Sequence, residues 1–398
     1  MPNGTVCDVS ATSVAPDPLL DALLTGVPAG ALAVVDPEVL AQTRAAADAL
    51  YAAPQPLPAR VLHGLAAVTA AWQGHGPLHA WHIAEGADEQ LLTDDEPADA
   101  QLAALRRHVD LLAVSPALST VADQEALHAA GLSPDQVVLV SQLVAFESYL
   151  GRLTVALAAL QGTELATVAA PGRTPAGRGR RKLDSPTTVA GSARPTRFTQ
   201  EVLAWEPWVP APAEDELTEA QVESFARKAT TNSVYFRLIS RTPGVTRARS
   251  DLDNAIFLRR DGLPKAEREL AAAVASKVND CVYCASVHAR KATGFSRRGD
   301  DVETLLAVDL PRDADWVPTD LTPLPAGQQG RWATLVDAAA RLSAVRPSFG
   351  PTDVARMREA GLDDREVVDL ATATAFFAWA NRLMLSLGEA ACPAPPTA

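Results

Sequence analysis

Two stretches of the sequence decide the fold: GLSPDQVVLVSQLVAFESYLGRL at residues 131–153 and GLDDREVVDLATATAFFAWANRL at residues 361–383. They align without a gap at an offset of 230 residues (361 − 131), with identical leucine, valine, phenylalanine and arginine residues coinciding. Both are mostly apolar over more than twenty residues, which predicts long, largely buried helices. A repeat on this scale predicts that the two halves of the chain share one fold.

A second, weaker correspondence lies upstream of the first. LPARVLHGLAAVTAAWQGHGPLHAWHIA at residues 57–84 aligns with LPKAERELAAAVASKVNDCVYCASVHAR at residues 263–290, at an offset of 206 (263 − 57). This register places His82 over His288, but non-cysteine residues lie over the two cysteines of the second stretch. The duplication therefore leaves one half with thiols and one half without.

The remaining windows are rich in Ala, Leu, Glu and Arg, with apolar residues three and four apart, which predicts an all-α protein of two similar helical bundles. Gly, Pro, Ser, Thr and Arg dominate residues 171–197, which is typical of a flexible linker. We expect a first domain at 18–165, a flexible basic linker at 166–198 and a second domain at 199–390. The linker cations, interpreted as solvated charge, are Arg173, Arg178, Arg180, Arg181 and Lys182.

Composition restricts the class of protein. With 35 Lys and Arg against 48 Asp and Glu, the net charge is −13, which disfavours nucleic acid as a partner. Asp, Arg, Gln or Pro interrupts the apolar stretches, so we expect no membrane span. Only Cys281 and Cys284 form a close pair among four cysteines, which indicates redox or metal chemistry in a reducing cytoplasm rather than a disulfide framework.

The stretch NDCVYCASVHARKATG at residues 279–294 contains the most specific chemistry. In a helix that starts at Cys281 after an Asn279-Asp280 cap and ends at Gly294, the spacing places Cys281, Cys284 and His288 on one face. The positive end of the helix dipole favours thiolate over thiol, and an imidazole one turn on can accept the proton. On position alone, the first cysteine is the better placed to ionise.

Glu269 is a possible proton relay on the preceding helix. It lies four residues before Ala273, close to the apolar stripe of that helix, where a carboxylate tends to have a raised pKa. The equally weighted alternative is an exposed Glu269 that pairs with Lys265 or Arg268.

The pattern formed by Glu269, Cys281, Tyr283, Cys284 and His288 resembles the signature of the AhpD-like alkylhydroperoxidases of the carboxymuconolactone decarboxylase superfamily. The second half is similar to alkylhydroperoxidase domain proteins, and the first half resembles a companion carboxymuconolactone-decarboxylase-domain protein. The chain thus looks like a tandem fusion of two AhpD-like domains, of which the first has lost the CxxC.

The resemblance implies a role for each residue. Cys284 would attack the peroxide and become a sulfenic acid, and Cys281 would resolve it as a disulfide. Glu269, His288 and Cys281 would relay the proton of Cys284. Tyr283 stands where the family often has a histidine, so no relay role is expected for it. The implied activity is that of a peroxidase needing neither cofactor nor metal, with a hydroperoxide substrate, an unidentified dithiol or protein reductant, and a homo-oligomer that is a trimer of two-domain chains.

Three other readings remain. Cys281, Cys284 and His288 could hold zinc, but no second ligand cluster follows them. The CxxC could be a non-catalytic redox switch in an interaction protein. General disulfide exchange is the third reading, although the sequence lacks the βαβ pattern of thioredoxin.

The first half offers four histidines and no thiol motif. His79 and His82 share a helical face, which would suit a metal or acid/base pocket, but packing or surface roles are favoured. The family resemblance implies cofactor-free lactone decarboxylation as the alternative activity, although no set of residues in this half points to it. Packing roles are also expected for Trp205 and Trp208. The repeated arginines are expected to form structural salt bridges. The histidines are His63, His75, His79 and His82, and the arginines are Arg152 and Arg382.

Overall fold

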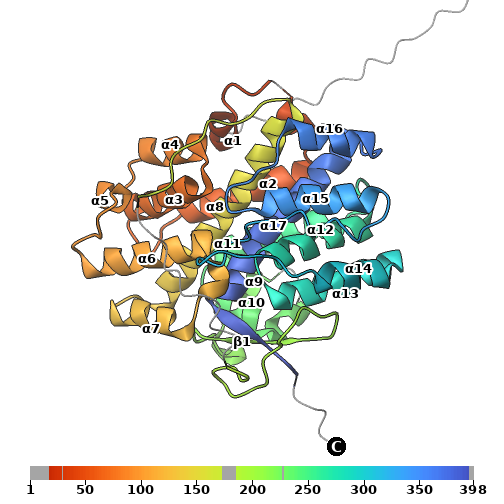
Figure 1. Cartoon of the computed structure of the whole chain (residues 1–398). Coiled ribbons are helices and arrows are strands. Elements are labelled where there is room, and N and C mark those ends of the chain that lie inside the picture. Colours follow the sequence, from red (N-terminus) through yellow and green to blue (C-terminus); the bar gives the residue numbers. More distant parts are fainter. Residues whose placement is uncertain (1–17, 29, 173–184, 226–227, 394–398) are drawn as a thin grey trace, which may run out of the picture.

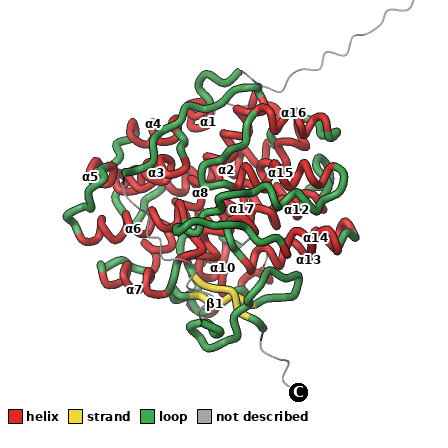
Figure 2. Tube along the Cα trace, viewed as in Figure 1, coloured by secondary structure: helices red, strands yellow, loops and turns green. Residues whose placement is uncertain are grey.

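The computed structural model describes residues 18–28, 30–172, 185–225 and 228–393. Helices dominate these residues, and the strands described are β1 (Ala204–Pro207) and β2 (Gly388–Ala391), which form one antiparallel pair (Figure 2). The predicted all-α class is confirmed. The linker cations at 173–182 lie outside the described residues.

Six helices recur in the same order in both halves of the chain. Their first residues are 206 apart for the first three pairs and 230 or 231 apart for the last three, as the two sequence offsets require. The first set is α2 (Pro37–Ala47), α3 (Ala59–Gln73), α4 (Gly76–Ala84), α6 (Ala100–Val114), α7 (Val121–Ala129) and α8 (Pro134–Leu160). The second set is α11 (Pro243–Phe257), α12 (Lys265–Val278), α13 (Val282–Ser296), α15 (Arg331–Ser343), α16 (Pro351–Glu359) and α17 (Asp364–Ser386).

The equivalent helices α8 and α17 pack against each other through the middle of the molecule, and α2 packs against α11 (Figure 1). Burial on nearly all sides explains why both central helices are apolar almost throughout. Phe146 and Trp379 meet edge to face across this pair, with ring centroids 5.2 Å apart. Buried side chains of both halves therefore form one continuous core. The exact domain limits stay a prediction.

The central helix α8 is, among the described residues, the one helix long and apolar enough to cross a membrane. The sequence had indicated no such stretch. However, 94% of its most apolar window is buried inside the protein, as in the core helix of a water-soluble fold.

Arg152 on α8 and Arg382 on α17 are both fully buried. The expected salt bridges are absent for both arginines within the described part of the chain, because their guanidinium groups donate to backbone carbonyls instead, together with the Gln73 side chain for Arg152.

Shorter elements complete the fold. β1 holds Trp205 against the end of α17, where its Nε1 donates to the Met384 carbonyl at 3.0 Å, and Trp208 Nε1 donates to Glu389 Oε1 at 3.1 Å. These contacts agree with packing roles for both tryptophans. The remaining elements are α1 (Pro18–Leu23), η1 (Ala31–Val34), the π-helical turn η2 (Asp48–Ala52), α5 (Glu89–Leu92), η3 (Pro116–Leu118), η5 (Glu214–Glu216), α9 (Glu219–Glu223), η6 (Lys228–Asn232), α10 (Val234–Ile239) and α14 (Gly299–Ala307).

The turn before the thiol helix repeats a turn of the first half. Gly74, between α3 and α4, has φ 74°, and its equivalent Asp280, between α12 and α13, has φ 57°. A left-handed residue is natural for glycine and costs about 1 kcal/mol or more for aspartate, so Asp280 stores backbone strain beside Cys281. Trp316 Nε1 donates to Asp280 Oδ2 at 2.8 Å, which helps to hold this conformation.

Candidate active site

The thiol helix begins one residue later than the sequence suggested. Asn279 caps the C-terminal end of α12, Cys281 is the N-cap residue of α13, and the first helical residue is Val282. The expectation that Gly294 ends the helix is wrong, because α13 continues to Ser296 and the left-handed residue is Arg297 with φ 60°. Both cysteines nevertheless lie in the first turn, at the positive end of the helix dipole.

Cys281 and Cys284 are not joined by a disulfide in this structure, and both are buried, with 1% and 5% of their surface exposed. Cys392 is also outside any disulfide, but it is half-buried and lies in the tail. Thiols at a helix N-terminus experience unsatisfied backbone N–H groups, which favour the thiolate, whereas burial opposes it. The position of the pair is suited to reversible oxidation.

Glu269 and His288 are brought together by the packing of α12 on α13. Glu269 is 1% exposed, and its Oε2 lies 2.6 Å from His288 Nδ1. Lys291 Nζ lies 3.8 Å from the other carboxylate oxygen. Glu269 thus contacts His288 and Lys291 rather than Lys265 or Arg268.

Two phenylalanines surround the imidazole. The His288 ring centroid lies 4.2 Å from that of Phe377 and 5.8 Å from that of Phe257. Burial lowers the pKa of His288, and the hydrogen bond and charge of Glu269 oppose this effect. The ring is therefore neutral at pH 7. Hydrogen bonding of Nδ1–H to Glu269 leaves Nε2 as a proton acceptor.

Sequence reasoning missed two groups near this site. Tyr235 on α10 is buried, its hydroxyl has no hydrogen-bond partner among the described residues, and it interacts electrostatically with both thiols. Burial raises the pKa of Tyr235. Asp253 on α11 interacts with His288 and Glu269, and burial raises its pKa also. Both residues lie outside the CxxC segment, so the spacing of residues within that segment could not predict that they lie near the thiols.

The histidines of the first half separate into two groups. His75 is the N-cap of α4: its Nδ1 accepts the Leu78 N–H at 3.0 Å and its Nε2 lies 2.8 Å from Thr154 Oγ1. His79 Nδ1 lies 2.9 Å from the Ala67 carbonyl. These two have the packing roles that the sequence favoured. His82, by contrast, contacts His63, not His79, with the two Nδ1 atoms 3.0 Å apart.

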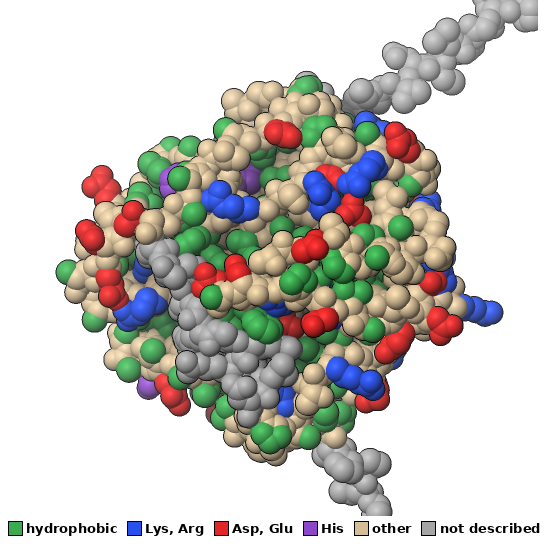
Figure 3. All heavy atoms as spheres, viewed as in Figure 1, with side chains coloured by type: hydrophobic (Ala, Val, Ile, Leu, Met, Phe, Trp, Pro, Cys, Tyr) green, Lys and Arg blue, Asp and Glu red, His purple; other side chains and the backbone are tan. Residues whose placement is uncertain are grey.

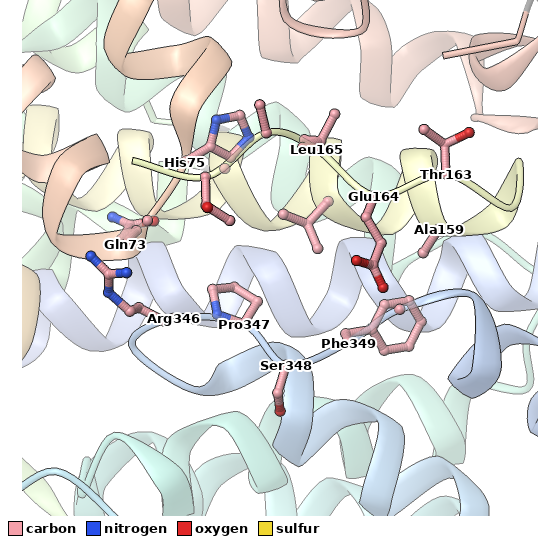
Figure 4. Close-up of a pocket in the computed structure, with 16 residues that line it drawn as sticks. Gln73, His75, Ala159, Thr163, Glu164, Leu165, Arg346, Pro347, Ser348 and Phe349 are labelled. Carbon is pink, nitrogen blue, oxygen red and sulfur yellow. The ribbon is translucent and has the colours of Figure 1, made fainter. Parts of the chain in front are cut away.

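A pocket of about 310 Å³ lies where the first half has His75 in place of Cys281 (Figure 4). Gln73, His75 and Glu164 of the first half line it from one side, and Arg346 and Phe349 of the second half line it from the other. Both ring nitrogens of His75 are already engaged, so His75 offers no free base to this pocket.

Neither half offers an evident metal centre within the described residues: they include no group of three or more His, Cys, Asp or Glu side chains arranged to hold an ion. On the face shown in Figure 3, Lys and Arg side chains are interspersed with Asp and Glu side chains.

The fold and this site define an all-α protein with a buried thiol pair next to a carboxylate–imidazole pair. Residues 243–315 match the model of the carboxymuconolactone decarboxylase family, and this segment includes both cysteines, Glu269 and His288. This segment is therefore similar to the carboxymuconolactone decarboxylase family, which confirms the family resemblance of the motif. A fusion of two such domains stays a prediction.

Comparison with solved structures gives a match to an alkylhydroperoxidase AhpD core, an uncharacterized peroxidase-related protein from Ralstonia eutropha JMP134. It is 22% identical, and the match covers 45% of this chain and 88% of that chain with a TM-score of 0.35. At that score the likeness carries no argument of its own. Comparison with curated proteins gives no match.

Proposed function

We propose that the second half of the chain is a thiol-dependent peroxidase that reduces hydroperoxides through a Cys281–Cys284 disulfide cycle. The observation that carries this proposal is the buried thiol pair in the first turn of α13, followed one turn later by an imidazole that is hydrogen bonded to Glu269. The helix N-terminus, the two thiols and the imidazole base lie within one short segment. Peroxide reduction requires such an arrangement, because the attacking thiol must lose its proton to a nearby base.

The imidazole is suited to accept the thiol proton. His288 follows Cys284 by four residues on α13, so both side chains lie on one face of the helix. With Nδ1–H donated to Glu269, Nε2 has a free lone pair, and the carboxylate stabilises the imidazolium that forms. Glu269 and His288 thus act together as the base, and Glu269 positions the ring.

In the first step the Cys284 thiolate attacks the peroxide, an S–O bond forms, the O–O bond breaks, and the departing alkoxide takes the proton from His288 to become an alcohol. In the second step the Cys281 thiol passes its proton to His288 and attacks the sulfenic sulfur of Cys284. An S–S bond forms, the S–O bond breaks, and the leaving hydroxide takes that proton to become water. An external dithiol then returns two electrons and two protons. No prosthetic group enters this sequence.

The surrounding assignments remain part of the proposal. They comprise a small-molecule hydroperoxide as substrate, a dithiol or protein reductant, a cytoplasmic location and no role for nucleic acid or membrane. The two halves of each chain are proposed to be the domains 18–165 and 199–390, joined by 166–198, with three chains per oligomer. The shared core through α8 and α17 supports the chain, rather than the single half, as the unit that assembles.

The experiment is a steady-state assay of peroxide loss with dithiothreitol as reductant. We expect many turnovers for the natural chain and none for Cys284→Ser. A single stoichiometric oxidation with no turnover would instead identify a redox switch, and unchanged turnover by Cys284→Ser would refute the assignment of the attacking thiol. The oligomer is tested separately by light scattering on the same sample.

A further inference from the structure

The first half contains a buried cluster of polar and aromatic side chains that thiol chemistry does not use. It consists of Tyr51 in the π-helical turn η2, His63 on α3, His82 on α4 and Glu147 on α8. By the offsets of 206 and 230, the corresponding residues of the second half are Phe257, Glu269, His288 and Phe377. Both halves thus have a histidine at the position of His82 and His288. The carboxylate differs in position: Glu147 of the first half corresponds to Phe377, and Glu269 of the second half corresponds to His63.

The hydrogen bonds of this cluster form a chain with a defined direction. Glu147 is fully buried and accepts from two sides: Tyr51 OH donates to Oε1 at 2.5 Å, and His82 Nε2 lies 3.1 Å from Oε2. A carboxylate accepts only, so His82 Nε2 carries the proton and its Nδ1 is the acceptor. His63 Nδ1, 3.0 Å from His82 Nδ1, must then donate.

This direction leaves His63 Nε2 as an acceptor without a hydrogen-bond partner among the described residues. His63 is only 6% exposed, and its remaining surface faces a pocket of about 410 Å³ that it lines together with Tyr51 and Trp81. Burial is the main cause that lowers the pKa of His63 to about 4, so the ring is neutral at pH 7. A volume of this size suits a small organic molecule.

The walls of the pocket favour a flat occupant and disfavour an anionic one. The rings of Tyr51 and His63 are stacked with centroids 4.9 Å apart, and Trp81 meets His63 edge to face at 5.7 Å. Arg44, Asp48 and Glu85 also line the pocket, which gives it one cation and two carboxylates. That balance disfavours an anionic ligand, whereas the aromatic walls favour a planar one.

A metal ion does not explain the cluster, because the described residues include no group of three or more His, Cys, Asp or Glu side chains arranged to hold one. The two Nδ1 atoms lie 3.0 Å apart, at hydrogen-bonding distance.

We propose that this pocket is a second ligand site of the protein, specific for a neutral planar molecule with an O–H donor, of the phenol class, whose hydroxyl hydrogen bonds to His63 Nε2. The ring of the ligand lies against Tyr51 and Trp81. His82, Glu147 and the Tyr51 hydroxyl are positioning groups that keep His63 Nε2 an acceptor. This site does not involve the thiols, so the chain would combine ligand binding in its first half with peroxide reduction in its second half.

The test is a calorimetric titration of the full-length protein, in a buffer acidic enough to keep 4-nitrophenol un-ionised, with 4-nitrophenol and, as the matched probe without an O–H group, 4-nitroanisole. We expect saturable binding of one 4-nitrophenol per chain and at least about tenfold weaker binding of 4-nitroanisole, because the buried acceptor is left unpaired. This comparison needs no variant and is unaffected by any folding defect.

Variants then locate the site. His63→Phe keeps an aromatic ring but removes the acceptor, so 4-nitrophenol binding should weaken by about tenfold or more. His79→Gln, which lies outside the pocket, and Cys281→Ser/Cys284→Ser should bind as the natural protein does. Absence of saturable binding, equal affinity for both probes, or full affinity in His63→Phe would each overturn the proposal, and none of these results bears on peroxide reduction.

Discussion

Arg152 and Arg382 hold the two halves of the chain together by the same contact made twice. Arg152 Nη2 donates to the carbonyls of Ser343 and Ala344, where α15 ends. Arg382 donates through Nε and Nη2 to the carbonyls of Leu112 and Ala113, near the end of α6. Each buried cation therefore satisfies backbone oxygens at the negative end of a helix from the other half.

We expect Arg382→Ala to lower the free energy of unfolding by about 3 kcal/mol or more, because it leaves buried carbonyls unpaired and opens a cavity between the halves. Urea unfolding measures the effect. The matched control is Arg107→Ala, an exposed arginine paired with Glu96, for which the change should stay within about 0.5 kcal/mol. Equal stability of both variants would show that the reciprocal contact contributes nothing.

A second prediction separates the two thiols. Cys281→Ser should undergo one oxidation per chain and then stall, because Cys284 sulfenic acid has no neighbour with which to form a disulfide. Trapping with dimedone followed by mass spectrometry should locate the adduct on Cys284. Cys392→Ser is the control and should turn over normally, since Cys392 lies outside the helix. Sustained turnover by Cys281→Ser would remove its assignment as the resolving thiol.

The carboxylate behind the imidazole gives a third prediction. Glu269→Gln should slow peroxide reduction by about 10²-fold at neutral pH, the scale of general-base catalysis. Glu269 raises the pKa of His288, whereas burial lowers it. Without that charge the pKa of His288 falls further, so the acidic limb of the rate profile should move to lower pH.

A merely structural Glu269 would give a different result, with a changed melting temperature and an unmoved rate profile. Glu267→Gln is a matched substitution on the same helix, where the carboxylate pairs with Arg331 outside the thiol site. It should leave the profile in place.

Much of the thiol site could be predicted because it is local in sequence. Cys281, Cys284 and His288 lie within one helix, where the three- and four-residue spacing determines which side chains share a face. Glu269 required only the packing of one neighbouring helix. Tyr235 could not be predicted, since its approach to the thiols depends on how a distant short helix packs.

The contacts of Glu147 and of the two repeated arginines could not be predicted, because they join elements far apart in the sequence. The cluster around Glu147 combines η2, α3, α4 and α8, and no periodicity within one helix reports such a contact. Glu147 did carry one usable signal, a carboxylate within an otherwise apolar helix. The arginines were interpreted as salt bridges because a sequence does not reveal that helix ends lie opposite them.

Tyr235 gives a fourth prediction. Its buried hydroxyl has no hydrogen-bond partner among the described residues, so Tyr235→Phe should raise the free energy of unfolding by about 1 kcal/mol. If that hydroxyl donates to the Cys284 thiolate or to the peroxide in the transition state, the same variant should reduce peroxide about tenfold more slowly. Stopped-flow oxidation and urea unfolding measure the two effects. A gain in stability without any loss of rate would mean that Tyr235 is only a packing residue.

The last prediction concerns acid. His108 on α6 is 4% exposed, and burial lowers its pKa to about 4, whereas in the unfolded chain it titrates near 6.5. The unfolded state therefore binds a proton first as the pH falls, and stability present above pH 6.5 is lost between about 6.5 and 4. A shift of this size corresponds to ~3 kcal/mol.

His108→Gln removes the titrating group, so the loss of unfolding free energy between pH 6.5 and 4.5 should become smaller by about that order. The control is His128→Gln, a substitution at an exposed histidine, which should show the same pH dependence of unfolding as the natural chain. Equal acid sensitivity in both variants would contradict a neutral, buried His108.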